Sequence, residues 1–207
     1  MIFRLREHMQ RLMDSAKVYR MEPNMTVKDL CDVAVALVSE NKMEECYIRP
    51  IIYRGFGAFG LVPKDSPIEV AFACWSWGAY LGKEALEQGI DVKISTWTRF
   101  APNTLPAMAK AGGNYLNSQL IKMEALMDGY QEGIALDTAG LLSEGSGENL
   151  FLVKNGSLIT PSSSCSVLQG ITRHSIITLA KAMGIPVKVQ RIPREAAYPA
   201  DALLLTA

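Results

Sequence analysis

The sequence predicts an α+β fold of two subdomains, residues 1–82 and 83–207. In the first half, two segments with helical spacing of apolar residues precede two strand-like segments. In the second half, strand-like segments alternate with two further helical segments. At the junction, residues 77–82 are rich in glycine and aromatic residues and have no periodic pattern, which indicates a linker at the end of the first subdomain.

The first subdomain is predicted to be a small α/β unit. Its elements are two helices followed by two strands, over residues 5–19, 27–40, 46–53 and 68–75. Thr26 is a candidate N-cap of the second helix, and Asp29 in the first turn complements the helix dipole. The glycine- and proline-rich segment 55–67 is expected to be the loop that joins the two strands.

The second subdomain is predicted to open with a strand and to contain two helices. Its expected elements are strands at 90–97, 133–137, 141–144, 187–191 and 202–206, helices at 115–127 and 172–183, and a hairpin at 149–160. The hairpin is indicated by Asn155-Gly156, a dipeptide suited to a type I′ turn. Gly184 follows the second helix as a candidate left-handed C-cap.

The composition excludes several classes of function. The 21 lysines and arginines balance the 21 aspartates and glutamates, so no net field attracts nucleic acid or an anionic membrane. The four cysteines are scattered and there are two histidines, which argues against a metal site and fits a reducing, cytoplasmic location. The N-terminus lacks the apolar core of a signal peptide, and the apolar runs are too short to span a bilayer.

Lys110 is the first candidate for a chemical role. It lies among small residues in segment 109–113, which leaves room for a ring beside the lysine stem. A lysine amine can form a Schiff base with an aldehyde cofactor such as pyridoxal phosphate. From this local sequence alone, an exposed loop lysine beside a glycine turn is the commoner outcome.

Glu144 adds a carboxylate at the end of a predicted strand, in the glycine-rich segment 143–149. Pyridoxal phosphate acts as an electron sink while its ring nitrogen is protonated, which calls for a buried carboxylate opposite that nitrogen. The alternative is a solvated glutamate in a turn. Glu148 is a second carboxylate in this segment, and it either orients the turn or is a surface charge.

A phosphate site is indicated at residues 170–173, just before a predicted helix. The amides of Ile171 and Thr172 would point at an anion along the helix axis, and the threonine hydroxyl adds a donor. Arg11 on the first helix is a candidate clamp for the same phosphate. The alternatives are that Thr172 only caps the helix and that Arg11 is an exposed arginine.

The order of these residues along the chain is more specific than any one of them. The set comprises Arg11, Tyr47, Arg49, Trp77, Tyr80, Lys110, Tyr115, Glu144, Leu168 and Thr172. In order and context it resembles the fold-type IV pyridoxal phosphate aminotransferases, most closely the branched-chain amino acid aminotransferases. The resemblance reaches nearly every residue of the chain and implies that the cofactor lies in the cleft between the subdomains.

The resemblance implies a role for each cofactor-binding residue. Lys110 is the Schiff-base lysine and proton shuttle, and Tyr115 donates to the phenolic oxygen of the cofactor. Glu144 pairs with the pyridine nitrogen, while Leu168 packs on the ring face. The phosphate is held by the remaining members of the set, namely Arg11, Ile171 and Thr172.

The resemblance also implies a substrate pocket. Tyr47 would contact the substrate α-carboxylate, and Arg49 the side-chain carboxylate of glutamate. Trp77, Tyr80 and Tyr115 would form an apolar wall for leucine, isoleucine or valine. An apolar wall with one arginine at its rim can accept both kinds of side chain without burying an unpaired charge.

The implied reaction is transamination of a branched-chain L-amino acid with 2-oxoglutarate, by a ping-pong mechanism through pyridoxamine phosphate. The implied assembly is a homo-oligomer, either a dimer or a hexamer. Alternatives are a D-amino acid aminotransferase, an aminodeoxychorismate lyase or an inactive cofactor-binding fragment. The family pattern extends beyond both ends of this sequence, so we expect a fold that is truncated at both termini.

Overall fold

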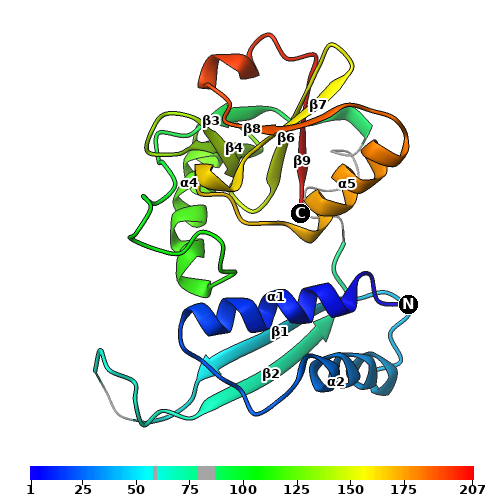
Figure 1. Ribbon diagram of the computed structural model, residues 1–207, viewed down its shortest axis with the longest axis vertical. Helices are drawn as coiled ribbons and strands as arrows, with labels where there is room; N and C mark the ends of the chain where they lie inside the picture. Colours follow the sequence, from blue (N-terminus) through cyan, green and yellow to red (C-terminus); the bar gives the residue numbers. More distant parts are fainter. Residues whose placement is uncertain (58–59, 79–86) are drawn as a thin grey trace. The chain divides into compact units, whose positions relative to one another are not determined.

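The computed structural model describes residues 1–57, 60–78 and 87–207, and the chain forms two units (Figure 1). Unit 1 spans Met1–Gly82 and unit 2 spans Lys83–Ala207. Helices and strands occur in both units, in keeping with the predicted α+β class. Among the described residues, no helix has the length and apolar character needed to cross a membrane.

The described part of unit 1 forms a two-stranded antiparallel sheet with two helices. Its elements are α1 (Leu5–Val18), α2 (Val27–Glu40), β1 (Tyr47–Arg54) and β2 (Ile68–Trp75). The strands pair from Tyr47 opposite Trp75 to Arg54 opposite Ile68. The helices contact each other and the sheet, and they bury small and apolar side chains, namely Met9, Ala16, Leu30 and Ala34.

The start of α2 confirms the predicted cap. The Asp29 amide donates to the Thr26 hydroxyl oxygen at 3.2 Å, and the Thr26 amide donates to the Asp29 carboxylate at 2.7 Å. Two amides that lack a partner inside the helix are thereby satisfied by a reciprocal capping box.

Unit 2 is built around a mixed seven-stranded sheet. Its strands are β3 (Val92–Ile94), β4 (Glu132–Leu136), β5 (Leu142–Gly145), β6 (Asn149–Lys154), β7 (Ser157–Pro161), β8 (Val187–Gln190) and β9 (Ala202–Thr206). The named helices in its described part are α4 (Tyr115–Met127) and α5 (Ile171–Ala182), with short 3₁₀ turns η1 (Gly112–Asn114), η2 (Ser163–Cys165) and η3 (Arg194–Ala197). The strand order is β3-β4-β5-β6-β7-β8, with β9 paired to β6. The β3–β4 and β7–β8 pairs are parallel and the others antiparallel.

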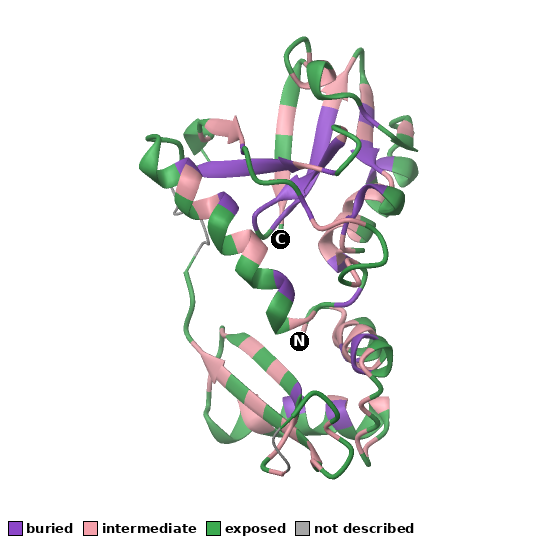
Figure 2. Ribbon diagram, turned by 90° about the vertical axis from the view of Figure 1, so that its left-hand side faces the viewer, coloured by how far each residue is buried: buried purple, intermediate pink, exposed green. Residues whose placement is uncertain are grey.

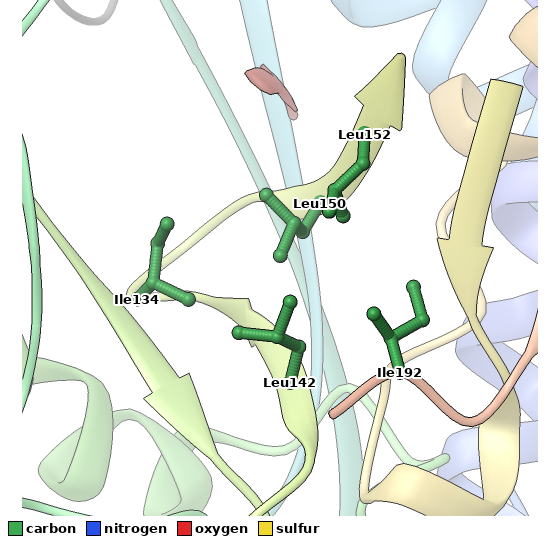
Figure 3. Packing of buried hydrophobic residues seen from close by; sticks show 5 residues of the cluster. All are labelled: Ile134, Leu142, Leu150, Leu152 and Ile192. Atoms are coloured by element: carbon green, nitrogen blue, oxygen red, sulfur yellow. The ribbon is translucent and has the colours of Figure 1, made fainter. Parts of the chain in front are cut away.

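The core of unit 2 lies on both faces of β6. Leu150 and Leu152 point to one side, where a buried cluster is formed by Ile134, Leu142, Leu150, Leu152 and Ile192 (Figure 3). Phe151 points to the other side and packs with Leu158 and with Ala180 of α5. Successive residues of a strand face opposite sides of the sheet, so a continuous apolar run here predicts a strand buried on both faces. Figure 2 shows this concentration of buried residues on the strands of unit 2.

Two local predictions in unit 2 are confirmed and one is corrected. Asn155 and Gly156 have φ of 49° and 69°, as a type I′ turn requires, and Gly184 ends α5 with φ of 73°. The strand expected at residues 90–97 is shorter in the structure, where β3 covers Val92–Ile94. The Asp91 amide donates to the Gln131 side chain, and beyond β3 the Glu124 carboxylate on α4 accepts hydrogen bonds from the next residues.

Candidate functional site

The side chain of Asn114 fixes the loop that carries Lys110. The Asn114 side-chain amide donates to the carbonyl oxygens of Pro106 and Ala109, at 3.1 and 3.0 Å. Asn114 and Ala109 are buried, whereas Lys110 is exposed. The loop therefore has an ordered base and presents the lysine side chain outward.

The Lys110 ammonium lies against Tyr115, the first residue of α4. Its Nζ donates to the Tyr115 hydroxyl at 2.6 Å, and the same nitrogen lies 5.3 Å from the centre of the tyrosine ring. The η1 turn lies between these two residues and leads directly into α4. The structure therefore pairs the predicted Schiff-base lysine with the predicted phenolic donor.

Glu144 is buried at the end of β5, with a residue exposure of 6%. Its Oε1 lies 3.0 Å from Nη2 of Arg99. Its Oε2 accepts from the Asn149 side-chain amide at 3.1 Å and from the Leu168 backbone amide at 3.0 Å. Three donors thus fix the orientation of a carboxylate that would otherwise be costly to bury.

Opposing influences act on the ionisation of Glu144. Burial raises the pKa of its carboxyl to about 7, while the charges of Arg99, Lys110 and Arg173 and the Leu168 amide lower it. An additional positive charge beside this carboxylate would favour its ionised form further. Glu144 is therefore suited to facing a cationic ring nitrogen.

Asn149 connects Glu144 to the start of α5. Besides Glu144, its amide donates to the Leu168 carbonyl oxygen at 2.9 Å. Gly170 follows closely, and a Cβ added there would collide with the Asn149 side-chain oxygen. Glycine at position 170 is therefore what lets the predicted phosphate segment approach the Glu144 network closely.

The N-terminus of α5 differs from the simple alternative in which Thr172 caps the helix. The N-cap is Gly170, so Ile171 and Thr172 are the first two helical residues and no side chain caps this end. The amides of a first helical turn have no carbonyl partner within their own helix and favour anions. Arg173 is directed to β7 instead, where it donates to Thr160 and to the Pro161 carbonyl oxygen.

Arg99 is a candidate site residue that sequence reasoning missed. It is 4% exposed, and in addition to Glu144 it binds the Asn117 side-chain oxygen at 2.9 Å. Its Nε is buried without a hydrogen-bond partner among the described residues. No local pattern around Arg99 marks it, because its partners come from β5 and α4, far along the chain. Asn149 was also missed, although its position across a tight turn from a strand-end glutamate could have indicated it.

Three of the predicted substrate residues, Tyr47, Arg49 and Trp77, lie together on unit 1. Tyr47, Trp75 and Trp77 form an aromatic cluster, with ring centres 5.0 Å apart for Tyr47–Trp75 and 4.7 Å apart for Tyr47–Trp77. The Arg49 guanidinium lies 5.1 to 5.8 Å from the centres of all three rings. Trp75 was not predicted, although its place opposite Tyr47 in the strand register follows from antiparallel pairing.

The remaining predicted residues are distributed as follows. Arg11 lies on α1 of unit 1 and is half-buried. Tyr80 lies outside the described residues. Lys110, Tyr115, Glu144, Leu168, Ile171 and Thr172 all belong to unit 2.

The donor set of unit 2 fits pyridoxal phosphate. It offers an amine, a phenol, a fixed buried carboxylate and a helix N-terminus, which match the aldehyde, the phenolic oxygen, the ring nitrogen and the phosphate of that cofactor. No group of three or more histidine, cysteine, aspartate or glutamate side chains is arranged to hold a metal in the described part of the chain.

Comparison with known proteins places the chain in a family. The family model for amino-transferase class IV matches residues 1–207. The branched-chain-amino-acid aminotransferase of Escherichia coli strain K12 is 51% identical over 206 residues, which cover 99% of this chain and 67% of that protein. The enzyme of the same name from Pseudomonas aeruginosa is 42% identical, over 99% of this chain and 66% of its own length.

Solved structures give the same result. A crystal structure of the Escherichia coli branched-chain amino acid aminotransferase superposes with a TM-score of 0.95 at 50% identity, over 99% of this chain and 68% of that one. The Thermobaculum terrenum enzyme in its PLP-form, the holo-form, superposes with a TM-score of 0.91 at 34% identity, over 99% and 66%. The chain thus spans about two thirds of the length of these relatives and belongs to the amino-transferase class IV family, with the fold of the branched-chain enzymes.

Proposed function

We propose that the chain carries the catalytic centre of a pyridoxal phosphate-dependent branched-chain amino acid aminotransferase. The reaction converts leucine, isoleucine or valine and 2-oxoglutarate into the branched-chain 2-oxo acid and L-glutamate. The observation that carries the proposal is the pairing of Lys110 with Tyr115 in the same unit as a buried, three-donor Glu144. Support also comes from the names of the relatives and from the PLP-form of the Thermobaculum terrenum enzyme.

Lys110 is the residue that moves protons in this proposal. Pyridoxal phosphate, when bound, supplies an electron sink for the bond that is broken at the substrate Cα. The Lys110 amine would bind the cofactor aldehyde and then carry the Cα proton. Tyr115 holds the lysine nitrogen at hydrogen-bond distance and would donate its hydroxyl proton to the phenolic oxygen of the cofactor.

Glu144 and the start of α5 orient the cofactor. A proton on the ring nitrogen is retained if an ionised carboxylate faces it, and Arg99, Asn149 and the Leu168 amide hold Glu144 for that purpose. The Ile171 and Thr172 amides would receive the phosphate, together with Arg11 from unit 1. Leu168 would contact the ring face.

The substrate side of the proposal rests on unit 1. Tyr47 would bind the α-carboxylate, and Arg49 the second carboxylate of glutamate or 2-oxoglutarate. Trp77 and Tyr80 would contact aliphatic side chains together with Tyr115. We further propose that 1–82 is part of the small domain, that 83–207 is the cofactor-binding domain and that the working enzyme is a homo-oligomer.

The test begins with cofactor binding and ends with turnover. The purified chain is incubated with pyridoxal phosphate, reduced with borohydride and digested, and the labelled peptide is identified by mass spectrometry. We expect one stable adduct, at Lys110, which is lost in Lys110→Ala and kept in the exposed-lysine control Lys181→Ala. An adduct that survives Lys110→Ala would overturn the cofactor assignment.

The second arm follows amino-group transfer from leucine to 2-oxoglutarate. We expect L-glutamate to appear, with less than about a thousandth of that rate in Lys110→Ala, because the variant has no amine to move the proton. Equal rates with D-alanine would favour a D-amino acid aminotransferase. Adduct formation without turnover would reduce the proposal to cofactor binding.

A further inference from the structure

Two further carboxyl groups are buried near the turn that follows Glu144. Glu132, the first residue of β4, is completely buried, and Glu148, which follows the turn after β5, is 4% exposed. Neither group has a role in the chemistry proposed above. Buried carboxyl groups that are close together are not both ionised unless each is compensated.

The hydrogen bonds distinguish the two groups. Glu132 accepts from Lys122 Nζ of α4 at 2.8 Å, and from the amides of Gly133 at 2.7 Å and Ser146 at 3.3 Å. Glu148 accepts the Gly147 amide at 3.0 Å through Oε2, while its Oε1 is buried without a hydrogen-bond partner among the described residues. The Lys122 ammonium is thus hydrogen-bonded to Glu132.

Glu148 also supports the residue next to Glu144. The Gly145 amide donates to the Glu148 carbonyl oxygen at 2.7 Å, and a Cβ on Gly145 would come within 2.9 Å of Glu148 Oε2. On either side of this turn, Glu144 and Asn149 are paired across the strands. A charge on Glu148 would have a hydrogen-bond donor at Oε2, the Gly147 amide, but none at Oε1 among the described residues.

We propose that Glu148 is a neutral, protonated carboxylic acid in the folded chain at mildly acidic pH, and that it is a positioning residue that fixes the 145–148 turn and thereby the orientation of Glu144. The groups that face it agree with this. Burial and the Glu132 charge raise the pKa of Glu148 to about 7, and Lys122 and the Gly147 amide oppose the rise without cancelling it. The link to Glu144 rests on the proposed function, whereas the protonation of Glu148 does not.

The first test compares the pH dependence of unfolding in the cofactor-free chain and in Glu148→Gln. The pKa of Glu148 in the folded chain lies above the ordinary value of 4.5. The proton on Glu148 therefore contributes its full stabilisation of the fold below about pH 4.5, and this contribution is lost as the pH rises through about 7. From urea titrations between about pH 5 and pH 8, we expect the unfolding constant of the unsubstituted chain to rise relative to Glu148→Gln by on the order of a hundredfold. Titration of Glu144 occurs in both proteins and cancels.

The exposed control Glu195→Gln should follow the unsubstituted chain at every pH. Parallel curves for the unsubstituted chain and Glu148→Gln, or a Glu148→Gln chain that is unfolded even at about pH 5, would overturn the proposal. A second measurement compares the infrared carbonyl band of protonated, buried carboxyl groups in the two proteins at about pH 6. The band should be weaker in Glu148→Gln than in the unsubstituted chain, because Glu144 contributes to both, and bands of equal strength would also overturn the proposal.

The positioning role is tested with pyridoxal phosphate itself. At about pH 6, Glu148→Gln should keep the dissociation constant of the unsubstituted chain within about twofold, because the neutral amide replaces a neutral acid. Glu148→Ala should raise it at least about tenfold by loosening the turn. Equal affinity in Glu148→Ala would overturn the positioning role alone, and no binding by the unsubstituted chain would overturn the proposed function while the pH test still stands.

Discussion

The two units hold their candidate residues in different physical ways. In unit 2, Glu144 is buried and its two carboxylate oxygens are bound by three donors. In unit 1, Arg49 is exposed and lies over the rings of an aromatic cluster, whose members Tyr47 and Trp77 are themselves 38% and 41% exposed. The geometry around Glu144 is fixed within unit 2, whereas the aromatic cluster around Arg49 remains partly exposed to solvent.

This difference follows from the tasks proposed for the two sets. A cofactor with fixed shape and charge benefits from preorganised partners, since reorientation during the reaction would weaken their electrostatic effect. A pocket for side chains of two kinds needs an apolar wall and a cation at its rim, which exposed aromatic rings and an arginine provide. Substitutions should therefore have large effects in unit 2 and small, substrate-dependent effects in unit 1.

The largest effect is expected when the Arg99–Glu144 pair is broken. At about pH 8, Glu144→Leu and Arg99→Leu should each lower the free energy of unfolding by about 3–5 kcal/mol, because each leaves a buried charge without its partner. The double variant should lose less than the sum of the single losses. Urea denaturation of the four proteins measures this cycle, and additive losses would show that the pair is not coupled.

An intermediate effect is expected at Gly170, which links Asn149 to the α5 N-terminus. Gly170→Ala forces its Cβ against the Asn149 side-chain oxygen, so Asn149 must move away from Glu144. We expect a loss of about 1–3 kcal/mol in the free energy of unfolding, together with weaker pyridoxal phosphate binding. Gly112→Ala is the matched control for the stability measurement, because a Cβ there meets nothing within 4 Å. Equal stability of the two variants would contradict the close packing at Gly170.

Elements that depend on neighbouring residues could be predicted from the sequence. The Thr26–Asp29 capping box and the Asn155-Gly156 turn are short patterns, and each determines its own backbone conformation. Lys110, Tyr115 and Glu144 were predicted through the family pattern, because a single lysine or glutamate in a glycine-rich segment has many uses.

Elements that depend on distant residues could not be predicted. Just beyond β3, the Glu124 carboxylate of α4 accepts hydrogen bonds from Ser95 and Thr96. No residue pattern within 90–97 indicates this contact. Arg99 has no periodic or motif signal, because its function is created when β5 and α4 bring Glu144 and Asn117 beside it. A buried arginine becomes recognisable only after the partner that compensates it is known.

The smallest effect is expected at Trp75, the unpredicted member of the aromatic cluster. Its ring is 5.1 Å from the Arg49 guanidinium, and exposed contacts of this kind contribute about 0.5–1 kcal/mol. Under the proposed function, Trp75→Leu should raise the KM for glutamate by about threefold by releasing Arg49, and should leave the KM for leucine unchanged. Steady-state kinetics with both amino donors measures the two values.

Trp75→Phe is the matched control, because it keeps a ring beneath the guanidinium and should restore most of the glutamate KM. A general disturbance of the β1–β2 sheet would instead raise the KM for glutamate and the KM for leucine together. Trp75→Phe would then show no difference between the two amino donors. The pattern of a selective change, rescued by a ring, would show that unit 1 acts through the placement of one cation. Equal changes for glutamate and leucine would mean that the aromatic cluster only stabilises the sheet, and the contrast between the units would then be one of stability rather than of substrate choice.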